Sequence, residues 1–122
     1  MDQKCWIITD HYTYSAGLIT AAYAKYLLAE KAIIVGNKVG DRMQFWADGG
    51  SKMTLPNSKI SPRIWTAFHD WENGCDDISK CFWLTYFDSV PAGNLDPNEE
   101  VSLSFFDYIT GNDSALDYIF DN

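Results

Sequence analysis

Two short apolar runs and the segment between them constrain the fold most strongly. Residues 5–9 (CWIIT) and 32–36 (AIIVG) are typical of buried strands. Residues 16–29 carry no charge before Lys25, and their apolar residues recur at helical spacing: Ala16, Ile19, Ala22, Tyr23, Tyr26 and Leu27. A helix between two strands favours a right-handed βαβ unit with parallel strands. We therefore expect an α/β domain whose first helix ends near residues 30–31.

Ser15 lies where the first expected strand turns into the expected helix, within residues 13–17 (TYSAG). A helix that begins there would be capped by the Ser15 hydroxyl or by Thr13. A serine at such a turn can also act as a nucleophile, because the free N–H groups and partial positive charge of the helix terminus stabilise an oxyanion. The pattern alone is more typical of an ordinary cap, so both interpretations stay open at this point.

Length and charge exclude several classes of protein. The 122 residues suffice for one domain with a real core, and 47% hydrophobic content argues against disorder. No apolar run approaches the ~20 residues of a membrane span. From Asp70 onward there are 12 acidic residues and one basic residue, Lys80, so a nucleic-acid surface is excluded there. The acidic half is either a solvated face or a docking surface for a basic partner.

The three cysteines predict different roles. Cys5 lies in an expected core strand, which indicates a small buried apolar residue. Cys75 and Cys81 are close enough to form a disulfide if their loop folds back, and such a bond suits an oxidising compartment. The two histidines, His11 and His69, have no metal-site spacing with the cysteines. We therefore expect no metal, and His69 beside Asp70 suggests a histidine–carboxylate pair.

The remaining segments predict short elements. Residues 43–47 and 52–55 flank the sequence DGGS at 48–51, which is a strong hairpin signal. Residues 55–58 (LPNS) predict a turn, and 60–68 predict an edge strand interrupted by Pro62. Residues 69–97 indicate a long structured loop. A short strand at 101–103 and helices at 104–109 and 114–120 complete the chain, the last one capped by Asn112 or Asp113.

In this order and spacing, the segments resemble a family of serine peptidases, the C-terminal processing (tail-specific) proteases and the tricorn core protease. The resemblance covers nearly the whole chain and rests on five motifs: 13–17 (TYSAG) for the nucleophile turn, 32–36 (AIIVG), 55–60 (LPNSKI), 96–101 (DPNEEV) and 111–116 (GNDSAL). It implies the ClpP/crotonase-like fold of stacked ββα units, here partial. It also implies an endopeptidase that needs no cofactor and acts on a peptide or protein substrate.

The resemblance assigns roles to individual residues. Ser15 is the expected nucleophile, and the backbone N–H of Ala16 is one oxyanion donor. One branch of the family takes its base from a Gly-Lys pair, where this chain has Gly40-Asp41-Arg42, and an arginine does not deprotonate. Lys38 is a weak substitute, out of register, and is more typical of a solvated loop lysine.

The tricorn-like branch uses an earlier histidine as its base, and here that histidine would precede Met1. Glu72, within 71–74 (WENG), resembles the late glutamate of that branch and would orient the base; a surface loop glutamate is the alternative. His11 lies four residues before Ser15, and we expect it to have a structural or substrate-facing role.

Two departures from the family leave a rival interpretation open. The base is not evident in the chain, and Leu18 stands where the family often has a glutamate. Both favour a catalytically inactive relative that acts as a binding or scaffold module. An acyl-CoA enzyme of the wider crotonase fold is disfavoured, because the 55–58 and 111–116 motifs resemble the peptidases.

The resemblance also carries expectations about assembly and location. We expect residues 1–122 to be one domain or half-domain of a longer, extracytoplasmic protein. The high aromatic content, 16%, suggests exposed apolar surface that binds the missing amino-terminal part or a second copy.

Overall fold

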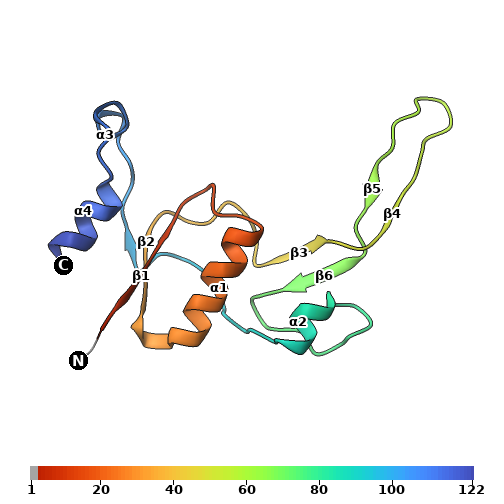
Figure 1. The fold of residues 1–122 in the computed structure, drawn as a ribbon, viewed down its shortest axis with the longest axis horizontal. Coiled ribbons are helices and arrows are strands. Elements are labelled where there is room, and N and C mark those ends of the chain that lie inside the picture. The colour runs from red at the N-terminus through yellow and green to blue at the C-terminus, as the bar shows by residue number, and fades with distance from the viewer. Residues whose placement is uncertain (1–2) are drawn as a thin grey trace. The chain divides into compact units, whose positions relative to one another are not determined.

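The computed structural model describes residues 3–122, and the chain divides into two units. The first unit comprises the residues up to Arg42 together with Asn94–Asn122, and it is built on a parallel sheet (Figure 1). Strands β1 (Cys5–Thr9) and β2 (Ala32–Gly36) pair in parallel along their full length. Helix α1 (Ala16–Leu28) connects them and continues as a 3₁₀ turn at Ala29–Lys31. The expected strand–helix–strand unit and its parallel pairing are therefore confirmed.

Strand β7 (Glu99–Glu100) extends this sheet in the order β1-β2-β7. The prediction of a strand at 101–103 was wrong by two residues. Only the start of that segment is held to the sheet, because the Val101 N–H donates to the Gly36 carbonyl at 3.0 Å.

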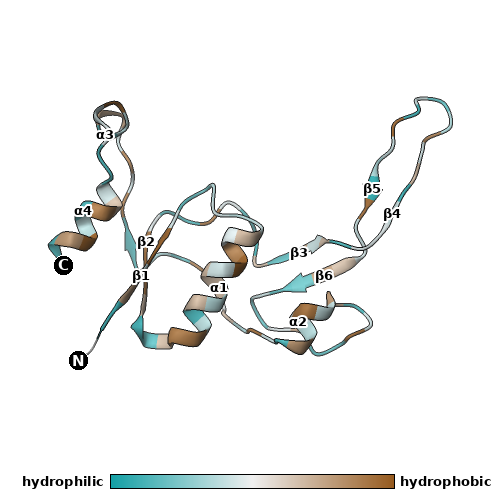
Figure 2. Cartoon of the chain, in the orientation of Figure 1, coloured by the Kyte–Doolittle hydropathy of each residue, from teal (hydrophilic) through white to brown (hydrophobic). Residues whose placement is uncertain are grey.

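The core of the first unit is narrow. Helix α1 buries Leu18, Ala21 and Ala22, while β2 buries Ile34 and Val35. The expected apolar face of α1 was partly wrong, because Tyr26 and Leu27 are exposed. A helix beside so small a sheet can bury only one stripe, although α1 is apolar on more than one face (Figure 2). Cys5 is also exposed, which contradicts its expected burial.

The second unit, Met43–Gly93, is an antiparallel ribbon with a loop and a short helix. Strand β3 (Gln44–Ala47) pairs with β6 (Ala67–Asp70), and β4 (Ser51–Lys52) pairs with β5 (Arg63–Ile64). Helix α2 (Trp83–Phe87) follows the loop. The buried Trp71 and Val90 belong to the core of this unit.

The predicted hairpin between 43–47 and 52–55 was wrong, because β3 and β4 pair with other strands. Asp48, Gly49 and Gly50 all have positive φ, at 62°, 61° and 67°. These three left-handed residues bend one arm of a longer ribbon instead of reversing the chain. The reversal comes at the expected 55–58 turn, where the Leu55 N–H donates to the Ile60 carbonyl at 2.9 Å.

The chain ends in two short helices of the first unit. Helix α3 (Phe105–Thr110) begins at a capping box formed by Ser104 and Asp107, and Gly111 ends it at φ 72°. Helix α4 (Ser114–Asp121) is capped by Asp113, whose carboxylate accepts two backbone N–H groups. Both helical predictions are confirmed. Among residues 3–122, no helix combines the length and hydropathy that a membrane crossing needs.

Candidate functional site

The turn that leads to Ser15 is held by its own side chains. Asp10 accepts the N–H of Tyr12 at 2.9 Å, and its own N–H donates to the Thr13 hydroxyl at 3.0 Å. The Thr13 N–H donates a hydrogen bond to the Asp10 carbonyl at 2.9 Å. Asp and Thr favour such local turns because their short side chains reach nearby backbone groups. The local sequence therefore determines the turn conformation of residues 10–13, directly after β1.

Two glycines hold this turn against the loop that follows β2. The Asn37 N–H donates to the Thr9 carbonyl at 2.8 Å, and the Gly40 N–H donates to the Thr13 carbonyl at 3.2 Å. A Cβ atom at Gly36 would overlap the carbonyl oxygen of Thr9, and one at Gly40 would overlap that of His11. Only glycine permits backbones to approach this closely. Side chains thus shape the turn itself, and backbone contacts hold it against the loop after β2.

Ser15 has a strained backbone and an unused hydroxyl. Its φ of 49° and ψ of −121° fall in a region that non-glycine residues rarely adopt. Both expected caps were wrong, because no side chain caps α1 and the Thr13 hydroxyl bonds to Asp10 instead. Ala29 at the other end of α1 has the same angles, so strain alone does not mark a functional residue. What distinguishes Ser15 is an exposed hydroxyl that the fold does not use.

The start of α1 can stabilise an anion. The Ala16 N–H makes no hydrogen bond to any residue in the range 3–122. The first turn contains no acidic residue that would neutralise the partial positive charge. Ser15 and the Ala16 N–H therefore lie together at an electropositive helix terminus.

A surface groove runs along β1 and ends beside Ser15. One wall is formed by residues 5–8 of β1, and the other by the small residues of α1: Gly17, Thr20, Ala21 and Ala24. Thr13 and Gly17, on either side of Ser15 in the sequence, also line it. Strand β1 is an edge strand of its sheet, and an edge strand presents unpaired backbone groups to which an extended chain can pair.

Neither candidate base within the first unit contacts Ser15. Lys38 forms an ion pair with Asp96 at 3.3 Å, and both side chains are exposed. His11 is exposed and its ring lies against Tyr12, with 4.0 Å between centroids. Lys38 therefore has the contacts of an ordinary surface lysine.

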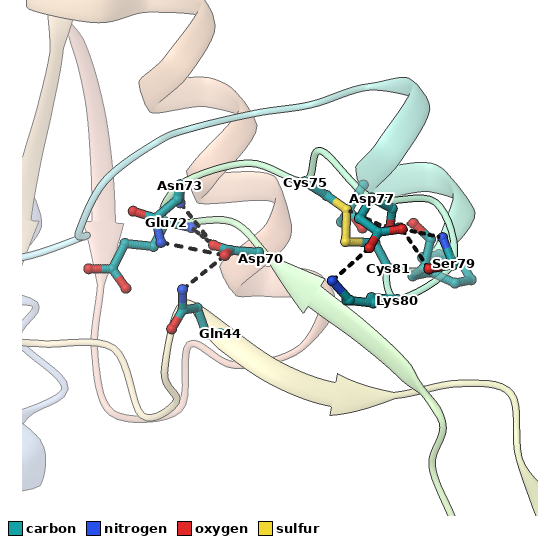
Figure 3. Close-up of a disulfide and its surroundings, with 11 residues drawn as sticks. Gln44, Asp70, Glu72, Asn73, Cys75, Asp77, Ser79, Lys80 and Cys81 are labelled. Carbon is teal, nitrogen blue, oxygen red and sulfur yellow. Dashed lines mark hydrogen bonds and ion pairs between the residues drawn. A yellow bond between two sulfur atoms is a disulfide. The ribbon is translucent and has the colours of Figure 1, made fainter.

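Glu72 lies in the second unit, on the loop after β6. Its N–H donates to the Asp70 carboxylate at 3.1 Å, and Asp70 also accepts from Asn73 and Gln44. Figure 3 shows the Glu72 carboxylate pointing away from Asp70. The Glu72 side chain is exposed, so Asp70 holds the backbone of the loop while the Glu72 carboxylate lies in solvent.

A buried histidine cluster in the second unit differs from the sequence expectation. His69 hydrogen-bonds Asp48 at 3.0 Å, not its neighbour Asp70. Its ring stacks between Phe45 and Phe82, at 4.8 and 4.6 Å between centroids. Burial lowers the pKa of His69, while the bond to Asp48 opposes that shift. Sequence reasoning missed this cluster because β3 was paired with the wrong strand. The available signal was the presence of aromatic residues in both segments, Phe45 in one and Phe68 and Trp71 in the other.

The expected disulfide between Cys75 and Cys81 is confirmed (Figure 3). It closes the loop at the point where Cys81 bridges to Phe68 of β6. Within residues 3–122, no cluster of three or more His, Cys, Asp or Glu side chains is suited to hold a metal ion.

Comparison with known proteins finds a likeness among the solved structures. No family model matches the sequence, and no curated protein matches it. A crystal structure of the tricorn protease is similar to 97% of this chain, with a TM-score of 0.50 and 21% sequence identity. The chain spans only 10% of the length of that protein. At this identity the likeness establishes a shared α/β fold and no more.

Proposed function

We propose that this chain carries the nucleophile turn of a serine endopeptidase, within the ClpP/crotonase-like fold of the tricorn and C-terminal processing proteases. The observation that carries the proposal is Ser15 itself. It has a strained backbone, its exposed hydroxyl caps nothing, and it adjoins the free Ala16 N–H. The likeness to the tricorn protease supports the fold that this role requires.

The proposed chemistry is acyl transfer. The Ser15 oxygen attacks the carbonyl carbon of the peptide bond while a general base accepts its proton. The carbonyl oxygen becomes an oxyanion that accepts a hydrogen bond from the Ala16 N–H. The C–N bond breaks, the amine takes the proton, and an ester remains on Ser15. Water then hydrolyses this ester by the same route.

The general base is proposed to lie outside residues 1–122, as in the tricorn-like branch. The contacts of Lys38 and His11 within the first unit support neither of them as the base. Glu72 remains the candidate for an orienting carboxylate, on the strength of the sequence resemblance and its free side chain.

An inactive binding module is the second candidate. It is favoured by one observation: within residues 3–122, Ser15 makes no hydrogen bond to a histidine, lysine or carboxylate side chain. Such a module would keep the groove along β1 and bind an extended peptide without cleaving it.

An extracytoplasmic location is proposed for either function. The Cys75–Cys81 disulfide supports it, because disulfides persist mainly in oxidising compartments.

Reaction with a fluorophosphonate tests the proposal. In the intact protein that contains this chain, we expect the reagent to modify Ser15, as read by peptide mass spectrometry, and to abolish peptide hydrolysis. Ser15→Ala should remove both, while Ser58→Ala, at another exposed serine, should change neither. Residues 1–122 alone should hydrolyse no peptide, because loss of one member of a triad costs ~10⁴-fold in rate. Peptide binding without modification of Ser15 would favour the inactive module.

A further inference from the structure

Two surfaces of this chain have opposite charge and the same apolar character. The first is the basic arm, residues 51–65, which contains β4, the turn and β5. Its basic residues are Lys52, Lys59 and Arg63, and no acidic residue occurs between Gly49 and His69. In a chain of net charge −8, this is an isolated positive segment.

The basic arm has no core of its own. Every residue from Ser51 to Ser61 is exposed, and the large apolar side chains Met53, Ile60 and Ile64 are 48, 61 and 57% exposed. Figure 1 shows β4 and β5 as a narrow ribbon that continues beyond β3 and β6. A two-stranded ribbon is marginally stable in water, so this arm gains stability when a partner covers it.

The second surface is the acidic patch, which comprises β7 and the helices α3 and α4, residues 99–122. It contains six acidic residues and no basic residue. It also exposes seven large apolar side chains: Leu103, Phe105, Phe106, Tyr108, Ile109, Leu116 and Phe120. Phe105 and Phe120 are 78 and 82% exposed, and large exposed apolar patches rimmed by polar residues mark interaction sites.

We propose that the basic arm of one copy of this chain docks on the acidic patch of a second copy. Charge complementarity selects this pairing, because two acidic patches repel each other and so do two basic arms. Apolar side chains on both surfaces supply the area removed from water. The contact is heterologous, because it joins two different surfaces of the two copies. It does not depend on any chemistry at Ser15.

Charge reversal in two separate variants tests the proposal. The arm variant carries Lys52→Glu, Lys59→Glu and Arg63→Glu. The patch variant carries Glu100→Lys, Asp117→Lys and Asp121→Lys, at exposed positions. Sedimentation equilibrium of the unmodified chain should show concentration-dependent association. The dissociation constant of each variant alone should be higher by about tenfold or more.

Mixing the two variants provides the decisive measurement. A 1:1 mixture pairs the negative arm with the positive patch and the positive arm with the negative patch, so association should return to near the level of the unmodified chain. Two controls have the same change in net charge: Lys4→Glu with Lys31→Glu and Arg42→Glu, and Glu30→Lys with Asp76→Lys and Asp88→Lys. Both controls should associate like the unmodified chain.

Three results would overturn the proposal. The first is an unmodified chain that stays monomeric at all concentrations. The second is an equal loss of association in the controls, which would indicate a non-specific effect of net charge. The third is a 1:1 mixture that associates no better than either variant alone, which would show that the arm of one copy does not contact the patch of another.

Discussion

The two units of this chain are held by different means. The first unit places Ser15 through backbone hydrogen bonds and the close approach of Gly36 and Gly40. The second unit also has backbone-paired strands and a close approach at Gly50, but it adds the Cys75–Cys81 disulfide and the ring stack around His69. A reacting group has to be held close to its productive geometry, and the backbone contacts of Gly36 and Gly40 are restraints of that kind.

A substitution at Gly40 should have the largest effect on this comparison. Gly40→Ala places a Cβ atom on the His11 carbonyl, so we expect a loss of about 2–4 kcal/mol in the free energy of unfolding. Gly17→Ala is the matched control, because its Cβ has room in α1 and should stabilise by about 0.5–1 kcal/mol. Urea denaturation measures both. Equal stability of the two variants would mean that the loop after β2 does not hold the Ser15 turn.

Relief of the strain at Ser15 should have a smaller effect. Glycine adopts the φ and ψ of Ser15 without strain, so Ser15→Gly should raise the free energy of unfolding by about 1 kcal/mol. Ser15→Ala should leave stability nearly unchanged, because the hydroxyl caps nothing. A loss of stability in Ser15→Ala of the size seen for helix caps, ~1 kcal/mol, would show that the hydroxyl is structural.

The smallest effect concerns pH and the second unit. Burial lowers the pKa of His69 from 6.5, so the unfolded chain takes up a proton that the folded chain resists. Stability should be full above pH 6.5 and should fall as the pH decreases toward the lowered pKa. His69→Phe should flatten this dependence, and His11→Gln should not. Thermal unfolding between pH 5 and 8 gives the comparison, and an unchanged slope in His69→Phe would contradict the role given to burial.

Local pattern was enough to predict the first unit and the ends of the chain. The 5–9 and 32–36 runs, the 16–29 spacing and the Asp113 cap all depend on residues close in sequence. The pairing of β3 with β6 joins residues twenty or more positions apart, whereas the DGGS sequence at 48–51 predicts a local hairpin. The exposure of Cys5 and Leu27 also depends on the width of the sheet, which no single segment encodes.

In the candidate site, too, some features follow from the local sequence and others depend on distant contacts. The place of Ser15 at the start of α1 follows from neighbouring residues and was predicted. Its positive φ and unused hydroxyl were not, because a serine before a helix is more typical of a side-chain cap, which Ser15 does not form. The bond between His69 and Asp48 was missed for the same reason as the strand pairing.

A thiol introduced at position 15 tests the central claim most directly, since it reports whether the start of α1 stabilises an anion there. In a Cys5→Ala background, the rate of alkylation by iodoacetamide against pH gives the pKa of the thiol in Ser15→Cys. We expect that pKa to lie about one unit or more below the ordinary 8.5, as at other helix amino termini. Ser58→Cys, in the exposed 56–58 turn, should titrate near 8.5. Identical pKa values at the two positions would contradict the claim that the Ser15 turn is built to stabilise negative charge.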